Sequence, residues 1–363
     1  MPAHGSRQKR QRLPQGLCLL LILATALAPG CGYLPPVIGQ EDLLVILASD
    51  EDRPLLEPLL GEVFGRTMAT PAPEPYFKVK WASPLEFKSF RRYKSLVIAS
   101  LSNPADSTGD VLIRKVLGPE RLAEARRGGN PIFIATDYLA RGQMFMGITA
   151  LDAIHAQAEI SRLSGWIFDR FEQQLRARQL DVVYRHKPEK KLAEELHTKY
   201  QWDLRIQHDY LIIRELPAQK FVWLGRGYPY RWLGVHWIDA ADTVRLTPDW
   251  SWGHMEYVAR QLFGAISIDS LFRSNDISAE NGHMIYILRG VWAHQTEIAG
   301  GPFITYVFRD RAQRRVYFVT GIVFNPGGAK ALLLRQQEVM IRTFHTFRDP
   351  PATNSQSSDE GLT

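Results

Sequence analysis

Acidic, imidazole and indole side chains are concentrated in one short segment, residues 249–256. A carboxylate and an imidazole in such a segment could act as a general acid–base pair, because both groups can exchange protons near neutral pH. The indole faces could stack on a sugar ring or line an apolar ligand cleft. The segment is therefore a candidate ligand site, and its candidate residues are Asp249, Trp250, Trp252, His254 and Glu256.

The local signatures of common enzyme classes are missing from the chain. There is no GxGxxG after a predicted strand, no GxxxxGK[ST], no HExxH and no GxSxG. A wider acid–imidazole set also includes His236, Asp239 and Asp242, but its spacing matches no known metal-ligand pattern. We expect no cofactor and no metal. The sequence leaves enzymatic activity undecided and favours a non-catalytic protein.

Tryptophan is concentrated in the second half of the chain, where six of the nine lie between residues 202 and 252. Tyr228 and Tyr230 fall in the same stretch and are further candidate ligand-binding residues. These rings could form a glycan or peptide site, or they could fill the core of an antiparallel sheet that has no disulfides. We expect most of them in the core, with Trp250 and Trp252 the most exposed.

Two further patterns lie near predicted strand ends. Gly300 and Gly301 precede a strand, where glycine allows another backbone or a ligand to approach closely, but a simple turn is the favoured explanation. Four arginines surround a predicted hairpin tip and could meet anionic lipid headgroups or glycans. A solvated turn is the simpler explanation for that cluster, which comprises Arg309, Arg311, Arg314 and Arg315.

The N-terminus has the features of an export signal. Residues 1–12 contain four basic side chains and no acid, and an uncharged run of twelve residues, 17–28, follows. Twelve helical residues span about 18 Å, which is short of the ~30 Å hydrocarbon core of a bilayer. Cys31 then follows small residues, an arrangement that resembles the bacterial lipobox, in which the cysteine receives a diacylglycerol. We predict a lipoprotein signal peptide over 1–30 and an acylated tether over 31–41; the alternative is an ordinary secretory signal.

The charge and location of the mature chain follow from this cleavage. Residues 1–30 hold four basic residues and no acids, so the formal charge falls from +6 to 40 − 38 = +2. A nearly neutral chain does not support nucleic-acid binding. Gly32, which follows Cys31, is not an acid. This favours the outer membrane facing the periplasm and leaves the inner membrane and the cell surface open.

The pattern over residues 42–149 predicts a first α+β domain. Its order is strand, helix, strand, strand, helix, strand, which is typical of a ferredoxin-like split βαβ sheet. If residues 85–93 form a helix, the order becomes that of a small parallel α/β sheet. A long amphipathic helix over 150–180 is expected to pack on this sheet or to bridge the two halves. The predicted strands are 43–48, 76–81, 95–101 and 131–136. One predicted helix begins after Asp50, and a second covers 110–127.

The pattern over residues 181–347 predicts a second α+β domain. Strand-like segments with tight polar turns alternate with helices, which indicates an antiparallel sheet flanked by helices. The residues from 348 to 363 are polar and rich in Pro and Ser, and we predict that this tail is disordered.

Several short segments resemble an uncharacterised family of lipoproteins from Bacteroidetes-type bacteria, known as a domain of unknown function. They are Phe221–Leu224, Gly290–Trp292, Gly300–Tyr306 and Val319–Phe324, and the likeness runs from about residue 41 to 347. The resemblance implies a lipid-anchored envelope protein with two α+β parts, and it assigns no catalytic residues. The second half also resembles the fold of the photosystem PsbP subunit, and this likeness concerns the fold alone.

Together these patterns predict a lipid-anchored lipoprotein of the bacterial cell envelope. Its membrane contact is the lipid on Cys31, and its role is that of a binding or structural protein. An envelope protein or a cell-wall glycan is the expected partner, and nucleic acid is not. The alternative is an envelope glycan-acting hydrolase that uses the carboxylates near Trp250.

Overall fold

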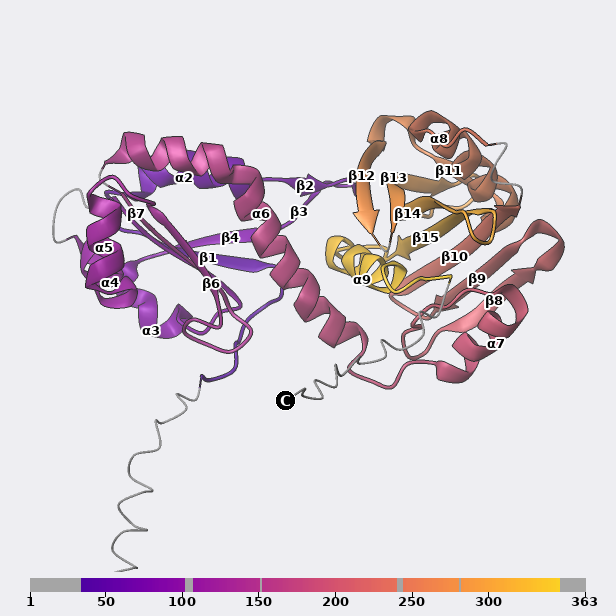
Figure 1. The fold of residues 1–363 in the computed structure, drawn as a ribbon, viewed down its shortest axis with the longest axis horizontal. Coiled ribbons are helices and arrows are strands. Elements are labelled where there is room, and N and C mark those ends of the chain that lie inside the picture. The colour runs from indigo at the N-terminus through magenta and orange to yellow at the C-terminus, as the bar shows by residue number, and fades with distance from the viewer. Residues whose placement is uncertain (1–33, 102–106, 151, 240–243, 281, 347–363) are drawn as a thin grey trace, which may run out of the picture.

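The computed structural model describes residues 34–101, 107–150, 152–239, 244–280 and 282–346. They form two domains that lie side by side, with the long helix α6 (Ala153–Val183) running from the first to the second (Figure 1). Residues 1–33 and 347–363 lie outside the described residues, so the signal peptide, lipidation of Cys31 and the disordered tail stay predictions. Among the described helices, none has both the length and the apolarity needed to cross a membrane.

Five strands form the sheet of the first domain, in the order β4-β1-β5-β7-β6. β1 pairs in parallel with β4 and with β5, and β5 pairs in parallel with β7. β6 is antiparallel to β7. The bounds are β1 Leu43–Leu47, β4 Lys78–Ala82, β5 Ser95–Ser100, β6 Ile132–Thr136 and β7 Met144–Thr149.

The predicted α+β class is confirmed, with a helix-covered first sheet, a long helix and a second, antiparallel sheet. The strand pairing in the first domain nevertheless differs from the split βαβ order and follows the parallel alternative. A helical segment, η1 (Pro84–Glu86) and α3 (Phe87–Phe90), connects β4 to β5. Such a crossover lets consecutive strands run in parallel. β7, which the sequence analysis did not identify, supplies the fifth strand.

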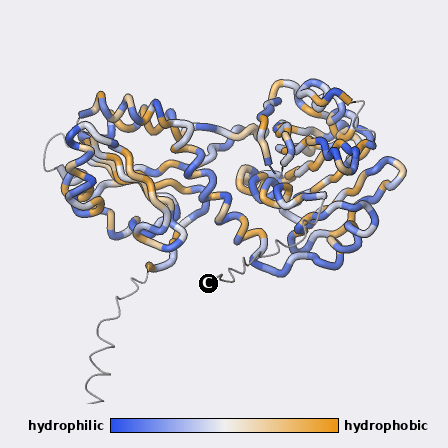
Figure 2. Tube along the Cα trace, viewed as in Figure 1, coloured by the Kyte–Doolittle hydropathy of each residue, from blue (hydrophilic) through white to orange (hydrophobic). Residues whose placement is uncertain are grey.

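Helices cover both faces of this sheet. α2 (Arg53–Phe64) and α6 pack on one face, and α4 (Thr108–Leu117) and α5 (Pro119–Arg126) pack on the other. The helix predicted over 110–127 is divided in two, because Gly118 has a φ of 80° and Pro119 begins the next helix. The central strands are the most apolar part of the domain (Figure 2).

Helix α6 belongs to both domains. Its N-cap is Asp152, whose side chain accepts a hydrogen bond from the His155 N–H at 2.7 Å. Its first half packs against α2 in the core of the first domain. Its second half lies beside α9 (Ala331–Ile341) of the second domain, where Gln336 donates to Gln179. The helix therefore packs on the first sheet and also bridges the halves.

Eight strands form the antiparallel sheet of the second domain, and the prediction of this sheet is confirmed. The path runs β11-β13-β14-β15-β10-β9-β8, and β12 pairs with the remaining part of β13. The bounds are β8 Leu211–Leu216, β9 Phe221–Arg226, β10 Tyr230–Asp239, β11 Ile266–Ile268, β12 Ser274–Glu280, β13 His283–His294, β14 Gly300–Asp310 and β15 Arg315–Phe324.

This sheet is also covered on both faces. α7 (Lys190–Tyr200) and α9 cover one face, and α8 (Pro248–Tyr257) with the π-helical segment Val258–Gly264 covers the other. Of the six tryptophans between residues 202 and 252, three are buried, namely Trp202, Trp237 and Trp252. The other three are half-buried and pack against the core, and these are Trp223, Trp232 and Trp250.

The hairpin of β2 (Thr67–Met68) and β3 (Glu74–Pro75) reaches from the first domain to the second (Figure 1). Both carboxylate oxygens of Glu74 accept hydrogen bonds from the Lys330 N–H at 2.9 Å, at the start of α9. The buried Arg335 guanidinium of α9 lies over the rings of Tyr76 and Phe77, at 4.8 and 5.4 Å. A helix cap and a cation–π contact thus connect the domains.

Candidate functional site: a histidine pair and a cationic cleft

Helix α8 places the predicted candidates on two different faces. Thr247 caps the helix by accepting a hydrogen bond from the Trp250 N–H at 3.2 Å, and Pro248 occupies the first turn. The helical period brings Trp250, His254 and Tyr257 to one face, where they line a shallow pocket of about 450 Å³. Part of the predicted segment therefore lines a surface pocket, and its binding of a ligand stays a prediction.

Two imidazoles meet beneath this pocket. His254 Nε2 lies 3.0 Å from Nε2 of His236, which comes from β10. The ring planes differ by 12° and their centroids are 5.2 Å apart, so the rings meet edge to edge in a nearly common plane. His236 Nδ1 lies 3.0 Å from the Lys220 carbonyl oxygen. Since a carbonyl only accepts, Nδ1 of His236 carries a proton, and its Nε2 then accepts one from His254.

Burial keeps both imidazoles neutral. Desolvation lowers the pKa of His236 to about 4, and the neighbouring His254 contributes to this shift. Burial also lowers the pKa of His254. The Trp250 ring lies 5.3 Å from the His254 ring at 11°, and the Phe318 ring lies 4.8 Å away. The pair is therefore an uncharged hydrogen-bonded unit between aromatic rings.

The carboxylates of the predicted set do not contact this pair. Asp249 is exposed on α8, and Glu256 forms an ion pair with Arg273 at 2.5 Å. Asp239 is bound to Lys220 and Arg315. Asp242 lies outside the described residues. In the described part of the chain, no group of three or more acidic, histidine or cysteine side chains is placed to hold a metal ion.

The other candidates lie elsewhere. Trp252 was expected to be exposed, but it is 8% exposed and packs on Phe303 with its ring beneath Arg273, because it lies on the core-facing side of α8. Tyr228 and Tyr230 are exposed at the turn between β9 and β10, and their rings touch edge to face. Tyr230 is six residues along the strand from His236, which is about 20 Å. The structure does not combine these tyrosines with the histidine pair.

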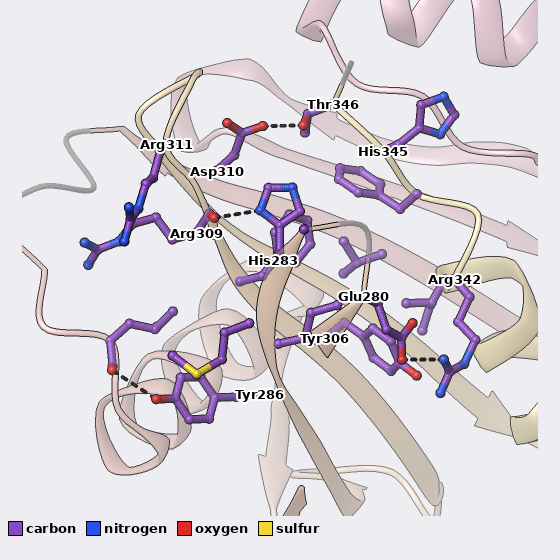
Figure 3. Close-up of a pocket in the computed structure, with 18 of the residues that line it drawn as sticks. Glu280, His283, Tyr286, Tyr306, Arg309, Asp310, Arg311, Arg342, His345 and Thr346 are labelled. Carbon is purple, nitrogen blue, oxygen red and sulfur yellow. Dashed lines mark hydrogen bonds and ion pairs between the residues drawn. The ribbon is translucent and has the colours of Figure 1, made fainter. Parts of the chain in front are cut away.

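A larger opening lies at one end of the second sheet. It is a cleft of about 1540 Å³, which we call the cationic cleft (Figure 3). Four segments line it, namely 244–246 before α8, the β12–β13 turn with the start of β13, the β14–β15 turn with the end of β14, and 341–346 after α9.

Arginines dominate the charges of this cleft. Arg342 forms ion pairs with Glu280 and with the buried Glu338 of α9. Arg309 donates to the Val244 carbonyl oxygen. Among the described residues, no carboxylate pairs with Arg309 or with two exposed arginines at the rim, Arg245 and Arg311. The cleft therefore has an excess of positive charge.

The acids of the cleft are already occupied. The buried Asp310 accepts a hydrogen bond from the Thr346 hydroxyl and another from the Gln313 N–H, which holds the C-terminal segment against the β14–β15 turn (Figure 3). His283 Nδ1 lies 3.0 Å from the Arg309 carbonyl oxygen. These bonds fix the walls of the cleft before any ligand arrives.

The floor of the cleft is apolar. Tyr286, Tyr306, Phe308 and Phe344 line it, and each is at most 8% exposed. Met284, by contrast, is 60% exposed. The sequence analysis did not identify this site. Its one sequence signal was the arginine cluster at the hairpin tip, of which Arg309 and Arg311 line the cleft while Arg315 pairs with Asp239.

The chain matches one family model, over residues 264–343, and that family is described as a domain of unknown function (DUF4837). The matched residues include β11 to β15 and α9, and hence three of the four cleft segments in whole or part. The match supports the expectation of an uncharacterised domain family. No curated protein matches the chain.

Solved structures give only distant likenesses. The Saccharomyces cerevisiae Ran-binding protein Mog1p is 12% identical over 40% of this chain and 90% of its own, with a TM-score of 0.30. A mutant of Mog1 gives the same coverage and a TM-score of 0.29. A protein from Bacteroides thetaiotaomicron is 12% identical over 41% of this chain and 46% of its own, with a TM-score of 0.19. At these scores the likenesses carry no argument about this protein.

Proposed function

We propose that the protein is a lipid-anchored lipoprotein of the cell envelope that binds a partner through the cationic cleft without catalysing a reaction. The observation that carries this proposal is the cleft itself, with an apolar floor and an arginine-rich rim. The sequence supports the anchor through the lipobox-like Cys31, and its resemblance to Bacteroidetes-type lipoproteins supports the location. We place the protein at the outer membrane facing the periplasm, with an envelope protein or a cell-wall glycan as its partner.

The arrangement near Trp250 supports a binding role over hydrolysis. A glycan hydrolase of the usual kind needs two carboxyl groups on either side of the scissile bond. Glu256 forms an ion pair with Arg273, and Asp249 is exposed on α8, so the structure shows neither carboxylate as half of such a pair. The two acids of the cleft, Asp310 and Glu280, are likewise engaged in structural bonds, with Thr346 and Arg342.

A photo-crosslinking residue in place of Met284 tests the proposal in cells. Met284 is 60% exposed in the cleft, and Ile298, which is fully exposed between β13 and β14, is the matched control. We expect a discrete crosslinked product at position 284 and none at 298, and a loss of the product with Cys31→Ala. Equal labelling at both positions, or no product at 284, would contradict binding at the cleft.

One observation favours a second candidate, an enzyme that uses His254 as a base. His254 is neutral, hydrogen-bonded to His236 and placed beside the half-buried Trp250 at a surface pocket. A panel of peptidoglycan and polysaccharide substrates distinguishes the candidates. Turnover that His254→Gln abolishes and Asp249→Asn preserves would establish this enzyme; no turnover by the wild-type protein would remove it.

A further inference from the structure

The size of the cationic cleft indicates the kind of ligand it can hold. Pockets for small molecules usually enclose about 300–1,000 Å³. The cleft encloses about 1540 Å³ and is open along one side. A cleft of this size therefore fits a segment of a larger molecule better than a single metabolite.

The rim charges indicate an acidic ligand. The guanidinium groups of Arg245, Arg309 and Arg311 have no carboxylate partner among the described residues. Figure 3 shows Arg309 and Arg311 extending to the same side of the cleft. A guanidinium group presents a planar fork of donors, which fits a carboxylate with two parallel hydrogen bonds. Three guanidinium groups that no described carboxylate neutralises thus surround one opening, and their charge favours anionic segments over cationic ones.

The floor distinguishes a peptide from a glycan. Sugar rings stack on exposed aromatic faces. The rings of Tyr286, Tyr306, Phe308 and Phe344 are at most 8% exposed, so they offer no such faces. The accessible apolar group is instead the flexible side chain of Met284. Methionine, tyrosine and arginine are enriched where proteins bind other proteins, and methionine adapts to different apolar side chains.

We infer that the cationic cleft binds an acidic segment of a partner protein, with carboxylates at Arg245 and Arg311 and an apolar side chain over Met284. This inference rests on the proposed function, since it names the partner of the same cleft. Arg309 has a different role, because its bond to the Val244 carbonyl holds the segment before α8 in place.

Fluorescence anisotropy with the full lipidated chain in non-ionic detergent tests the inference. The probe is a fluorescein-labelled peptide of alternating Glu and Leu, and the comparison peptide carries Gln in place of Glu. We expect the acidic peptide to bind about 10-fold more tightly, with an affinity that falls as salt rises, because exposed charges are screened.

Two variants locate the binding. The double variant Arg245→Ser/Arg311→Ser should lower the affinity for the acidic peptide about 10-fold, because each lost arginine–carboxylate pair is worth about 3-fold. Its affinity for the Gln peptide should be unchanged. Met284→Glu should weaken binding of the acidic peptide as well, by repulsion. Arg170→Ser, at an exposed arginine of α6 outside the cleft, is the matched control and should change the affinity little. Circular dichroism establishes that each variant is folded.

Three results would overturn the inference. The first is equal affinity for the Glu and Gln peptides. The second is an unchanged affinity in the double variant. The third is flotation with phosphatidylglycerol vesicles that requires Arg245 and Arg311 while the peptide does not bind, which would make the ligand a lipid headgroup. If crosslinking at Met284 succeeds while the acidic peptide fails, the proposed function stands and this inference falls.

Discussion

Glu74 of the first domain caps the α9 helix of the second domain, where its carboxylate lies 2.9 Å from the backbone nitrogen of Lys330. The same carboxylate accepts a hydrogen bond from the Ala331 N–H at 2.9 Å. The first backbone N–H groups of a helix have no partner within the helix, and the helix dipole favours a negative charge there. A residue 256 positions away in the sequence therefore completes a helix that leads to the cationic cleft.

Replacing Glu74 tests this cap. Glu74→Gln should cost about 1 kcal/mol of unfolding free energy and Glu74→Ala about 1–2 kcal/mol, the usual range for losing a capping side chain. Urea unfolding measures the loss. Glu194→Gln, at an exposed glutamate of α7, is the matched control and should change stability by less than about 0.5 kcal/mol. Equal effects of the Glu74 and Glu194 variants would contradict the cap.

The histidine pair makes stability depend on pH. Burial, aided by His254, lowers the pKa of His236 to about 4 from the ordinary histidine value of 6.5. The unfolded chain therefore binds a proton on this residue at a higher pH than the folded chain does. The contribution of His236 to the free energy of unfolding is therefore fully present above about pH 6.5 and declines as the pH falls from 6.5 to 4. The total loss from this residue is at most about 3 kcal/mol.

Urea unfolding of the wild-type protein and of His236→Gln at pH 8, 6.5, 5 and 4 measures this dependence. The variant lacks the titrating group, so its free energy of unfolding should fall less steeply over this range, from a lower value at pH 8. Parallel profiles for the two proteins would show that His236 does not titrate differently in the folded and unfolded chains.

Gly301 lies within β14, not in the simple turn that was the favoured sequence interpretation, and another backbone segment approaches it closely. A Cβ at this position would lie 2.1 Å from the Val323 carbonyl oxygen, and a backbone atom cannot move aside as a side chain can. Gly301→Ala should therefore cost more than about 2 kcal/mol. Gly227→Ala, where nothing lies within 4 Å of the added Cβ, is the control and should change stability by less than about 1 kcal/mol. Thermal unfolding compares them, and similar melting temperatures would contradict the steric account.

The elements of the fold were largely predictable because their signals are local. Apolar runs such as 43–48 and alternating strands such as 231–238 identify themselves by period, and so does the amphipathic α6. Strand pairing is not local, and the parallel order of the first sheet depended on a single turn of helix, Phe87–Phe90, and on the missed strand β7. The helical turn is too short to show a period, and β7 is a short apolar run that period alone does not distinguish from a helix.

The candidate site was predictable only in part, for the same reason. Trp250 and His254 share a face of α8 because they are four residues apart, and that relation can be read from the sequence. Which face of α8 packs on the sheet, and so buries Trp252, depends on the sheet beneath the helix. The partner of His254 is His236, from another element, and the cationic cleft assembles four segments between residues 244 and 346. Such assemblies follow from tertiary packing.

Mass spectrometry of the mature N-terminus tests whether this envelope protein carries a lipid anchor. The protein is isolated from membranes of its bacterial host and digested, and the N-terminal peptide is identified. We expect Cys31 to be the first residue and its sulfur to carry a diacylglycerol, and we expect the Cys31→Ala protein no longer to sediment with membranes. A mature N-terminus at another residue, or an unmodified Cys31 thiol in membrane-bound protein, would contradict this expectation.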